Sequence, residues 1–405
     1  MGAGFDGWSY GDEQYLAIFA SYVDKQGIVR NPMLSCSVLE DIDDQTLWDD
    51  VSEDDKFFGF TAEDLFDHLM LTFHDEYDLR LPDANGDYTI ELTADNLKEF
   101  FGFFVCDNCN TNRSMANRTE IPMVGDATHR LNAAVETELI GPKERRNKRN
   151  VITAHNSEKR KLILKVDKLM GEFKTLKNSS VLRPKCMQML NQDVKPQRLQ
   201  DTRWASKFTL LQKEQKLRPV YIAINWPPDH NVRSFLPAIE EVDQIEALVE
   251  ALKKCESISK AIQQSGTERQ SLSDIRDMFD GLIHDFLHYP NHAYRVSLNH
   301  LRKDHPIVNN QDFENGIVKI LKGETLTPCE EEAVKMFKKK TVVRPVTELT
   351  YTEQCKQRGK LQRTSEYTET SRTRHRRFQH MRESIQQSKT LHALPSCAHG
   401  TRKSC

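Results

Sequence analysis

The stretch that decides the fold is residues 101–132, which read FGFFVCDNCNTNRSMANRTEIPMVGDATHRLN. The apolar run Phe101–Val105 predicts a buried strand that ends at Asp107, and polar residues with helical spacing follow. The run 121–124 predicts a second strand, and a helix starts near His129. A strand that delivers a carboxylate at its carboxyl end, before a helix and another strand, is typical of a metal ligand or catalytic acid in an α/β fold. Asp107 is equally compatible with being the N-cap of the next helix.

The beginning of the chain shows a similar arrangement. Asp6 lies in a Gly-rich segment, and the aromatic and β-branched run Tyr15–Val23 follows it. This pattern predicts two strands joined by a turn around Gly11. Asp6 would then lie near a strand end, as Asp107 does. The alternative is a plain turn residue, because Asp-Gly is a common turn dipeptide.

Composition and charge restrict the class of protein. The 405 residues are 38% hydrophobic and 29% charged, with a mean hydropathy of -0.64. The net charge of -3 conceals an asymmetry, because residues 1–100 hold 24 Asp or Glu and 5 Lys or Arg, whereas residues 341–405 hold 5 and 13. We therefore expect any contact with a polyanion in the middle or rear of the chain. The sequence has no signal peptide and no apolar run of membrane-spanning length, and its nine cysteines follow no pattern. This combination predicts free thiols in a reducing compartment and no membrane contact.

Helical patterns fill most of the second half. Apolar residues recur with helical spacing from Leu162 to Leu176 and across residues 235–340. Thr327-Pro328 before Glu330–Glu332 predicts a helix start, as Thr61 before Glu63-Asp64 does in the first half of the chain. The predicted organisation has four parts: the first part of an α/β core at residues 1–140, a basic linker and helix at 141–205, a helical domain at 206–340, and a basic disordered tail at 341–405.

Two basic clusters and one aromatic residue are candidates for contact with nucleic acid. The clusters lie at residues 143–149 and 159–161, and each is either a charged surface segment or a nuclear address or phosphate-contacting patch. Arg203-Trp204 precedes a helix, where the pair could stack on a base, although a tryptophan in such a position usually packs against the protein.

Four segments now stand in one order: Asp6-Gly7-Trp8-Ser9, Cys106-Asp107-Asn108-Cys109-Asn110-Thr111-Asn112, Gly125-Asp126-Ala127-Thr128-His129 and Asp201-Thr202-Arg203-Trp204. In this order they resemble the transposases of the hAT class of DNA transposons. That resemblance implies an RNase-H-like mixed sheet with a large all-helical inserted domain. It also implies that Asp6 and Asp107 match the first two of three acids that hold two Mg²⁺ ions. His129 matches the histidine of a C-x-x-H motif, and Arg203-Trp204 matches the pair whose tryptophan manages a flipped base.

The chain also departs from that family. Asp126 stands where the family has the cysteine of C-x-x-H, and no BED-type zinc finger precedes Asp6. The third acid, and the C-terminal segment that carries it and forms the dimer, are not found in the sequence. Glu330–Glu332 are the nearest candidates, but a helix start explains them without catalysis. Because one ligand of the metal site is missing, we expect no DNA cleavage or strand transfer, and we do not expect a homodimer.

The sequence therefore leaves three functions open. The first is a transposase-like, catalytically inactive, nuclear protein derived from a hAT element, with DNA as its partner and Mg²⁺ as the implied cofactor. The second is a non-enzymatic nucleic-acid or protein interaction module that uses the helical domain and the basic segments. The third is a metal or redox role for Cys106 and Cys109, which form a single C-x-x-C pair.

Overall fold

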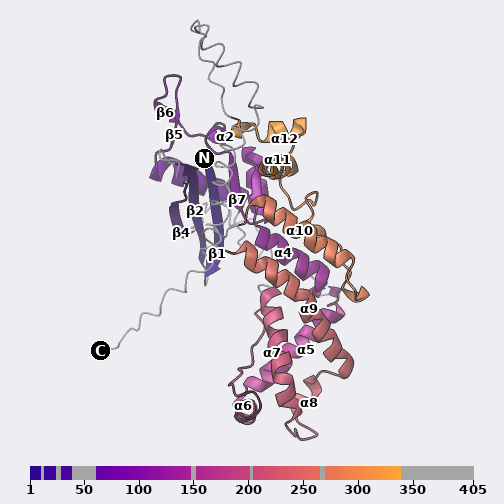
Figure 1. Ribbon diagram of the computed structural model, residues 1–405. Coiled ribbons are helices and arrows are strands. Elements are labelled where there is room, and N and C mark those ends of the chain that lie inside the picture. Colours follow the sequence, from indigo (N-terminus) through magenta and orange to yellow (C-terminus); the bar gives the residue numbers. More distant parts are fainter. Residues whose placement is uncertain are drawn as a thin grey trace, which may run out of the picture. The chain divides into compact units, whose positions relative to one another are not determined.

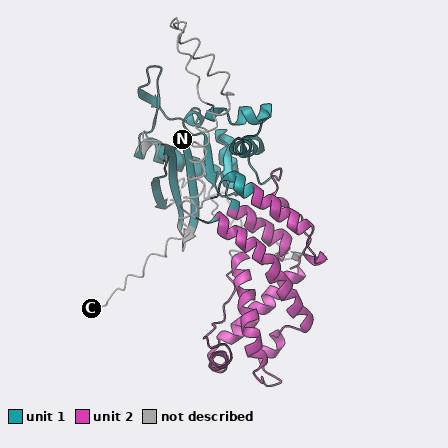
Figure 2. Cartoon of the chain, viewed as in Figure 1, with its two compact units in different colours: residues 1–127, 263–276, 306–405 teal, residues 128–262, 277–305 magenta. Residues whose placement is uncertain are grey.

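The structure is a computed structural model (Figure 1), and it describes residues 1–10, 13–23, 29–38, 61–146, 152–200, 204–264 and 270–338. The chain forms two compact units, each assembled from separated stretches (Figure 2). The first comprises residues 1–127, 263–276 and 306–405, and the second comprises residues 128–262 and 277–305. The predicted divisions after residues 140, 205 and 340 do not coincide with these boundaries. The predicted tail, residues 341–405, lies outside the described residues.

The first unit contains a mixed sheet, which has six strands within the described residues. They are β1 (Gly2–Tyr10), β2 (Glu13–Val23), β3 (Val29–Arg30), β4 (Met33–Val38), β7 (Phe103–Cys106) and β8 (Met123–Gly125). The order is β3–β2–β1–β7–β8, and β4 also pairs with β2. Strands β1 and β2 are antiparallel, which confirms the predicted strand pair, whereas β1 with β7 and β7 with β8 run parallel. The predicted α/β class is therefore confirmed.

The two faces of this sheet bury different sets of side chains. Successive residues of a strand point to opposite faces, so Phe104 and Cys106 face one side of β7, and Phe103 and Val105 face the other. The first side packs against α1 (Ala62–Met70) and α3 (Asn110–Thr119), and the second packs against α11 (Gln311–Lys322) and the residues around it. Burial on both faces explains why the run before Asp107 is continuously apolar.

Local capping signals place the helices of this unit. Thr61 forms a capping box with Asp64 at the start of α1, and Thr327 forms one with Glu330 at the start of α12 (Pro328–Ala333). These two contacts confirm the helix starts that the sequence predicts. The smaller elements of the unit are β5 (Arg80–Pro82), β6 (Tyr88–Glu91), α2 (Leu97–Phe100) and the first residues of α10 (Leu272–Leu287).

The second unit is mainly helical. Its principal elements are α4 (Ala127–Ala134), α5 (Glu158–Lys174), α6 (Leu176–Leu190), α7 (Trp204–Ile222), α8 (Asn231–Phe235), α9 (Ile239–Ile262) and the rest of α10. Most of the predicted apolar face at residues 162–176 is buried, but Leu176 is 90% exposed. The prediction is wrong there because α5 ends at Lys174 and the side chain of the next residue, Thr175, caps a new helix. Leu176 therefore begins α6 on a different face.

Candidate metal centre

Three neighbouring strands bring acidic residues to one edge of the sheet. Strands β1 and β7 pair with Gly4 opposite Val105, and continuing that register by two residues places Asp6 opposite Asp107. Strands β7 and β8 pair with Cys106 opposite Gly125, and the next step places Asp126 opposite Asp107. Residues that are opposite one another on adjacent strands point to the same face of the sheet. Asp107 and Asp126 thus lie just past the carboxyl ends of β7 and β8, with Asp6 in the same row. The prediction that Asp6 lies near a strand end is wrong, because β1 continues from Gly2 to Tyr10 and Asp6 lies in its middle.

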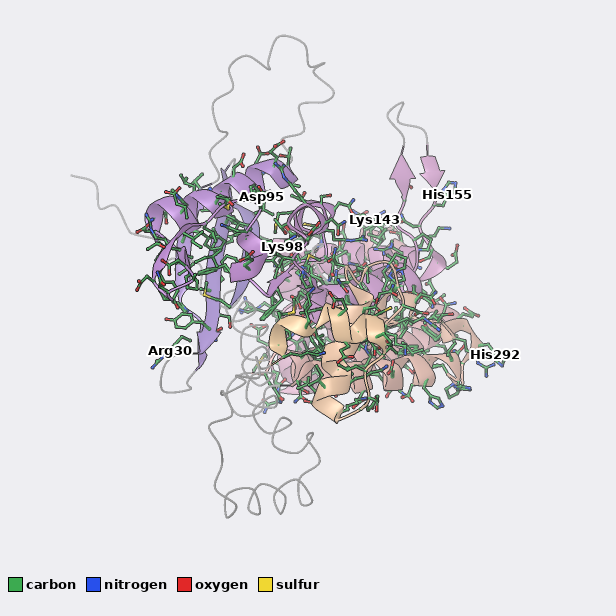
Figure 3. All side chains as sticks on the ribbon, turned by 90° about the horizontal axis from the view of Figure 1, so that it is seen from above. Arg30, Asp95, Lys98, Lys143, His155 and His292 are labelled. Atoms are coloured by element: carbon green, nitrogen blue, oxygen red, sulfur yellow. The ribbon has the colours of Figure 1, made fainter. Side chains whose placement is uncertain are left out.

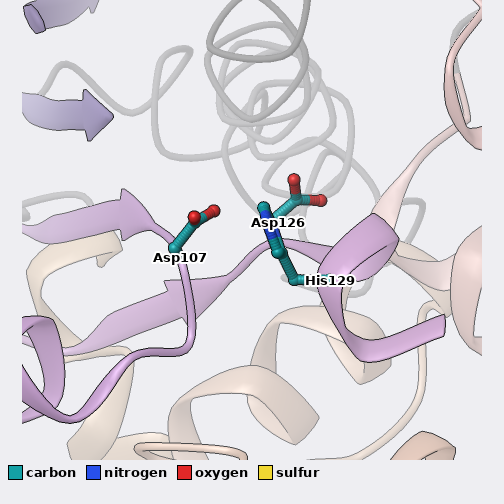
Figure 4. Close-up of side chains that lie close together, drawn as sticks. All are labelled: Asp107, Asp126 and His129. Carbon is teal, nitrogen blue, oxygen red and sulfur yellow. The ribbon is translucent and has the colours of Figure 1, made fainter. Parts of the chain in front are cut away.

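Two of these carboxylates meet an imidazole. Asp107, Asp126 and His129 each offer one ligand atom, and these atoms lie within 4.8 Å of one another (Figure 4). Among the described residues this is the only group of three or more His, Cys, Asp or Glu that meets the criterion. Asp126 immediately precedes α4, and His129 lies three residues later in its first turn. Residues three apart on a helix lie on one face, so this spacing aims both side chains at the same point.

Two asparagines hold the acid-bearing loops together. Asn108 donates from Nδ2 to the backbone oxygen of Asp126 at 3.2 Å, and Asn112 donates from Nδ2 to the backbone oxygen of Asp107 at 3.0 Å. The backbone N–H of Asp126 donates to the oxygen of Cys106 at 3.0 Å. These bonds fix the backbone on either side of the cluster, which is what a metal centre needs because its ligands must be positioned before the ion arrives.

Gly125 permits this close approach of the two loops. A Cβ atom at position 125 would lie 1.7 Å from Oδ1 of Asn108, so any side chain there would have to displace the Asn108 amide. The position therefore favours glycine, because the Asn108 amide lies directly over its backbone.

The donor set can be tested against the ion that the family resemblance implies. Two carboxylates suit a hard divalent cation such as Mg²⁺. The third donor is an imidazole, which is a better ligand for Mn²⁺, Zn²⁺ or Fe²⁺ than for Mg²⁺. A single group of three atoms within 4.8 Å fits one ion. The residues therefore fit a divalent cation, and their chemistry favours Mn²⁺ over Mg²⁺.

Asp6 lies one strand away from this group and does not belong to it. Its side chain is buried at 8% exposure, in β1. Burial raises the pKa of the Cys106 thiol well above its usual value, and the negative fields of Cys109, Asp107 and Asp6 raise it further. That influence agrees with a position of Asp6 beside the end of β7. The structure thus brings Asp107 and His129 together, with Asp6 as a neighbour.

The two cysteines of the C-x-x-C pair take separate structural roles. Cys106 lies in the apolar core between the sheet and α1, and the Cys109 sulfur accepts from the N–H of Asn112 as the N-cap of α3. Burial raises the pKa of both thiols. Protonated thiols are poor metal ligands and nucleophiles. This geometry argues against a shared metal or redox site at Cys106 and Cys109.

Glu330–Glu332, the nearest candidates for the third acid, form contacts at the start of α12 and with lysines. Glu330 is buried, closes the capping box at Thr327 and pairs with Lys319 at 2.8 Å. Glu331 pairs with Lys338, and Glu332 pairs with Lys335. These contacts agree with the helix-start explanation that the sequence suggests.

Trp204 is a packed residue in this structure. Its side chain is 3% exposed, its backbone N–H donates to Oδ1 of Asn132 at 3.3 Å, and its ring lies 6.3 Å from that of Phe208. Stacking on a base would require this ring to leave its pocket. Residues 201–203, including Arg203, lie outside the described residues.

Sequence reasoning missed Asp126 as a ligand, because it treated the residue as a departure from a motif. The available signal was its position: an acid directly after an apolar run, three residues before a histidine at a helix start. Asp107 was identified as an acid at the end of a predicted strand, and the same reasoning would have identified Asp126.

Comparisons with known proteins find no matching family model and no matching curated protein. Within the described residues, every helix is too short or too polar to cross a bilayer.

Proposed function

We propose that the chain is a hAT-transposase-derived protein with an RNase-H-like core that binds one divalent cation at Asp107, Asp126 and His129, and that does not cleave or transfer DNA strands. The observation that carries the proposal is the convergence of Asp107, Asp126 and His129 at the end of a parallel strand pair, beside Asp6 on the neighbouring strand. The helical stretch 128–262, which interrupts the first unit, also supports an inserted domain. A protein of this ancestry has DNA as its partner and the nucleus as its place of action.

The proposed loss of activity follows from the number of ions. Two-metal strand transfer uses ions about 4 Å apart, one for the attacking oxygen and one for the leaving oxygen. A cluster of two carboxylates and an imidazole holds one ion, and among the described residues no further acid completes a second such group. Because both ions must be positioned closely for an in-line reaction, a single-ion site binds metal without supporting the chemistry.

Metal binding tests the first half of the proposal. We expect Mn²⁺ to bind the full-length protein, measured by electron paramagnetic resonance or titration calorimetry, with one site and higher affinity than Mg²⁺. Asp107→Ala and Asp126→Ala each remove a ligand, so each should lower the affinity by at least about tenfold. Asp95→Ala is the matched control, because Asp95 is an exposed carboxylate of the same unit (Figure 3). Equal loss in all three variants, or no stoichiometric binding, would refute the site.

A nuclease assay tests the second half. We expect no Mn²⁺- or Mg²⁺-dependent nicking or strand transfer on a hairpin-end DNA substrate. Nicking that is abolished by Asp107→Ala would contradict the proposed inactivity while leaving the metal site intact.

A second candidate function is a non-enzymatic nucleic-acid interaction module. The observation that favours it is a basic two-stranded ribbon in the second unit, formed by β9 (Arg145–Arg146) and β10 (Ile152–Ala154). Salt-dependent binding to duplex DNA in the presence of a chelator would support this function, because phosphate contacts release counterions without needing a metal. Absence of binding at about 50 mM salt would count against it.

A further inference from the structure

Two exposed histidines lie one helical turn apart at the carboxyl end of α10, in the second unit. His284 and His288 are four residues apart, and residues at this spacing lie on one face of a helix. The centroids of their rings are 4.6 Å apart, and the ring planes are inclined at 38°. The backbone N–H of His288 donates to the oxygen of His284 at 3.3 Å, which closes the turn between them. The helix therefore presents two imidazoles side by side on its surface.

A hydrogen bond defines which nitrogen of the His288 ring carries the proton. Nδ1 of His288 lies 2.9 Å from the backbone oxygen of His284, and a carbonyl oxygen only accepts hydrogen bonds. Nδ1 is therefore the donor, and in the neutral ring the lone pair is on Nε2. Histidines that bind a metal through one nitrogen usually donate the other N–H to a carbonyl or carboxylate oxygen. The His288 ring is thus arranged as a ligand through Nε2.

The surroundings of His284 suit the same role. Its Nδ1 lies 3.8 Å from Oδ1 of Asp285, whose other carboxylate oxygen accepts a hydrogen bond from Nζ of Lys254 in α9. Nδ1 of His284 thus faces a carboxylate, as Nδ1 of His288 faces a carbonyl. Asp280 lies one turn before His284 on the same helix face and adds a negative charge. The carboxyl end of a helix is itself the negative end of its dipole, so this position favours a cation.

We propose that His284 and His288 bind one divalent transition-metal ion that prefers imidazole, such as Zn²⁺ or Ni²⁺, through their Nε2 atoms. Two histidines four residues apart on one helix face are a recurring zinc-binding arrangement. In the described part of the chain no third His, Cys, Asp or Glu completes a group with them, so water fills the remaining positions around the ion. Two nitrogen donors suit Zn²⁺ and Ni²⁺ better than Mn²⁺ or Mg²⁺. The site therefore differs in preferred ion from Asp107, Asp126 and His129, and it does not rest on the proposed function.

The test measures Ni²⁺ binding to the full-length protein by titration calorimetry. Asp107→Ala is present in every protein of the series, so that the cluster at the sheet edge does not contribute. Ni²⁺ is the probe because it suits imidazole, whereas the thiolates of free cysteines compete for zinc. His284→Ala and His288→Ala should each lower the Ni²⁺ affinity at least about tenfold, because each removes one of the two protein ligands. Mn²⁺ affinity should be the same with and without these two substitutions.

Stability gives a second measurement of the same site. The two rings are held side by side only in the folded helix, so Ni²⁺ bound there should raise the urea concentration at the midpoint of unfolding. His284→Ala and His288→Ala should abolish that increase. Both side chains are exposed, so the unfolding curves recorded without metal should match that of the parent protein. Matching metal-free curves separate the loss of a ligand from a folding defect.

His292→Ala is the matched control. His292 is an exposed histidine of the same unit, four residues after His288 and beyond the end of α10 (Figure 3). The variant removes one surface imidazole and leaves the pair intact, so Ni²⁺ affinity and the metal-induced increase in stability should be unchanged. An equal loss in His292→Ala, or unchanged Ni²⁺ affinity in His284→Ala and His288→Ala, would overturn the proposal. The cluster at the sheet edge fails separately, because its test is Mn²⁺ binding to the protein that retains Asp107.

Discussion

The carboxylates of the two units have different neighbours. In the helical unit, Glu136 lies between two cations, at 3.0 Å from Arg160 Nη2 and 2.6 Å from Lys207 Nζ, and buried Glu214 is bonded by Arg218 and Tyr221. At the edge of the sheet, Asp107 and Asp126 lie within 4.8 Å of each other. Like charges at such a distance disfavour one another, whereas opposite charges stabilise the ionised form. The first arrangement serves the fold, and the second fits the divalent cation that we propose.

The largest expected effect comes from removing a carboxylate charge that stabilises the helical unit. Glu136→Gln keeps the shape of the side chain and removes its charge. The substitution leaves Arg160 and Lys207, whose side chains are 7% and 2% exposed, facing a neutral amide. Loss of one partner of a buried ionic group costs about 3–5 kcal/mol. Urea unfolding should show this loss in the free energy of unfolding.

Glu250→Gln is the matched control for that measurement. Glu250 pairs with Lys253 on the surface of α9, and its side chain is 66% exposed. An exposed pair of this kind contributes under about 1 kcal/mol. If the two variants unfold at the same urea concentration, the buried network of the helical unit is not structural and the comparison fails.

A smaller effect is expected from the glycine at the sheet edge. Gly125→Ala forces a methyl group against Asn108, so the amide must move and its bond to the oxygen of Asp126 must break. Overpacking of this kind costs about 1–3 kcal/mol. Because that bond positions the backbone of Asp126, Mn²⁺ affinity should fall as well. Thermal unfolding and metal titration measure the two consequences.

Gly281→Ala is the control for Gly125→Ala, because an added methyl group has room at position 281. Gly281 lies inside α10 with open space around its Cα, so alanine should raise stability by about 0.5–1 kcal/mol and leave metal affinity unchanged. Tolerance of alanine at position 125 with full metal affinity would show that the two loops do not depend on their close approach.

The sequence predicted elements that depend on local signals. The strand pair at the start of the chain, the run before Asp107 and the capped helix starts at Thr61 and Thr327 all follow from neighbouring residues. Predicting the cluster of Asp107, Asp126 and His129 would have required the register in which the strands pair. Which residue lies opposite Asp107 is set by how β7 and β8 align, and a shift of one residue would move every side chain to the other face. A single sequence does not state that alignment, so Asp126 was missed.

The basic segments illustrate a different limit. Residues 143–149 and 159–161 are alike in composition. Arg160 is buried because Glu136 and the oxygen of Gly141 are its partners, and both lie about 20 residues earlier in the chain. Composition cannot distinguish a cation that pairs inside the fold from one on a ribbon, because the distinction depends on tertiary contacts.

The smallest expected effect concerns pH and the helical unit. Burial lowers the pKa of His305, and the charges of His300 and Arg130 lower it further, although Glu138 and Asp304 oppose this. The unfolded chain, with a histidine pKa of about 6.5, then binds more protons than the folded chain as pH falls through this value. Stability is therefore retained above about pH 6.5 and lost below it. The urea concentration at the midpoint of unfolding should decrease as the pH is lowered from about 7.5 to about 5.5, and His305→Gln should flatten that dependence. An unchanged slope in the variant would assign the pH dependence of stability to other titratable groups.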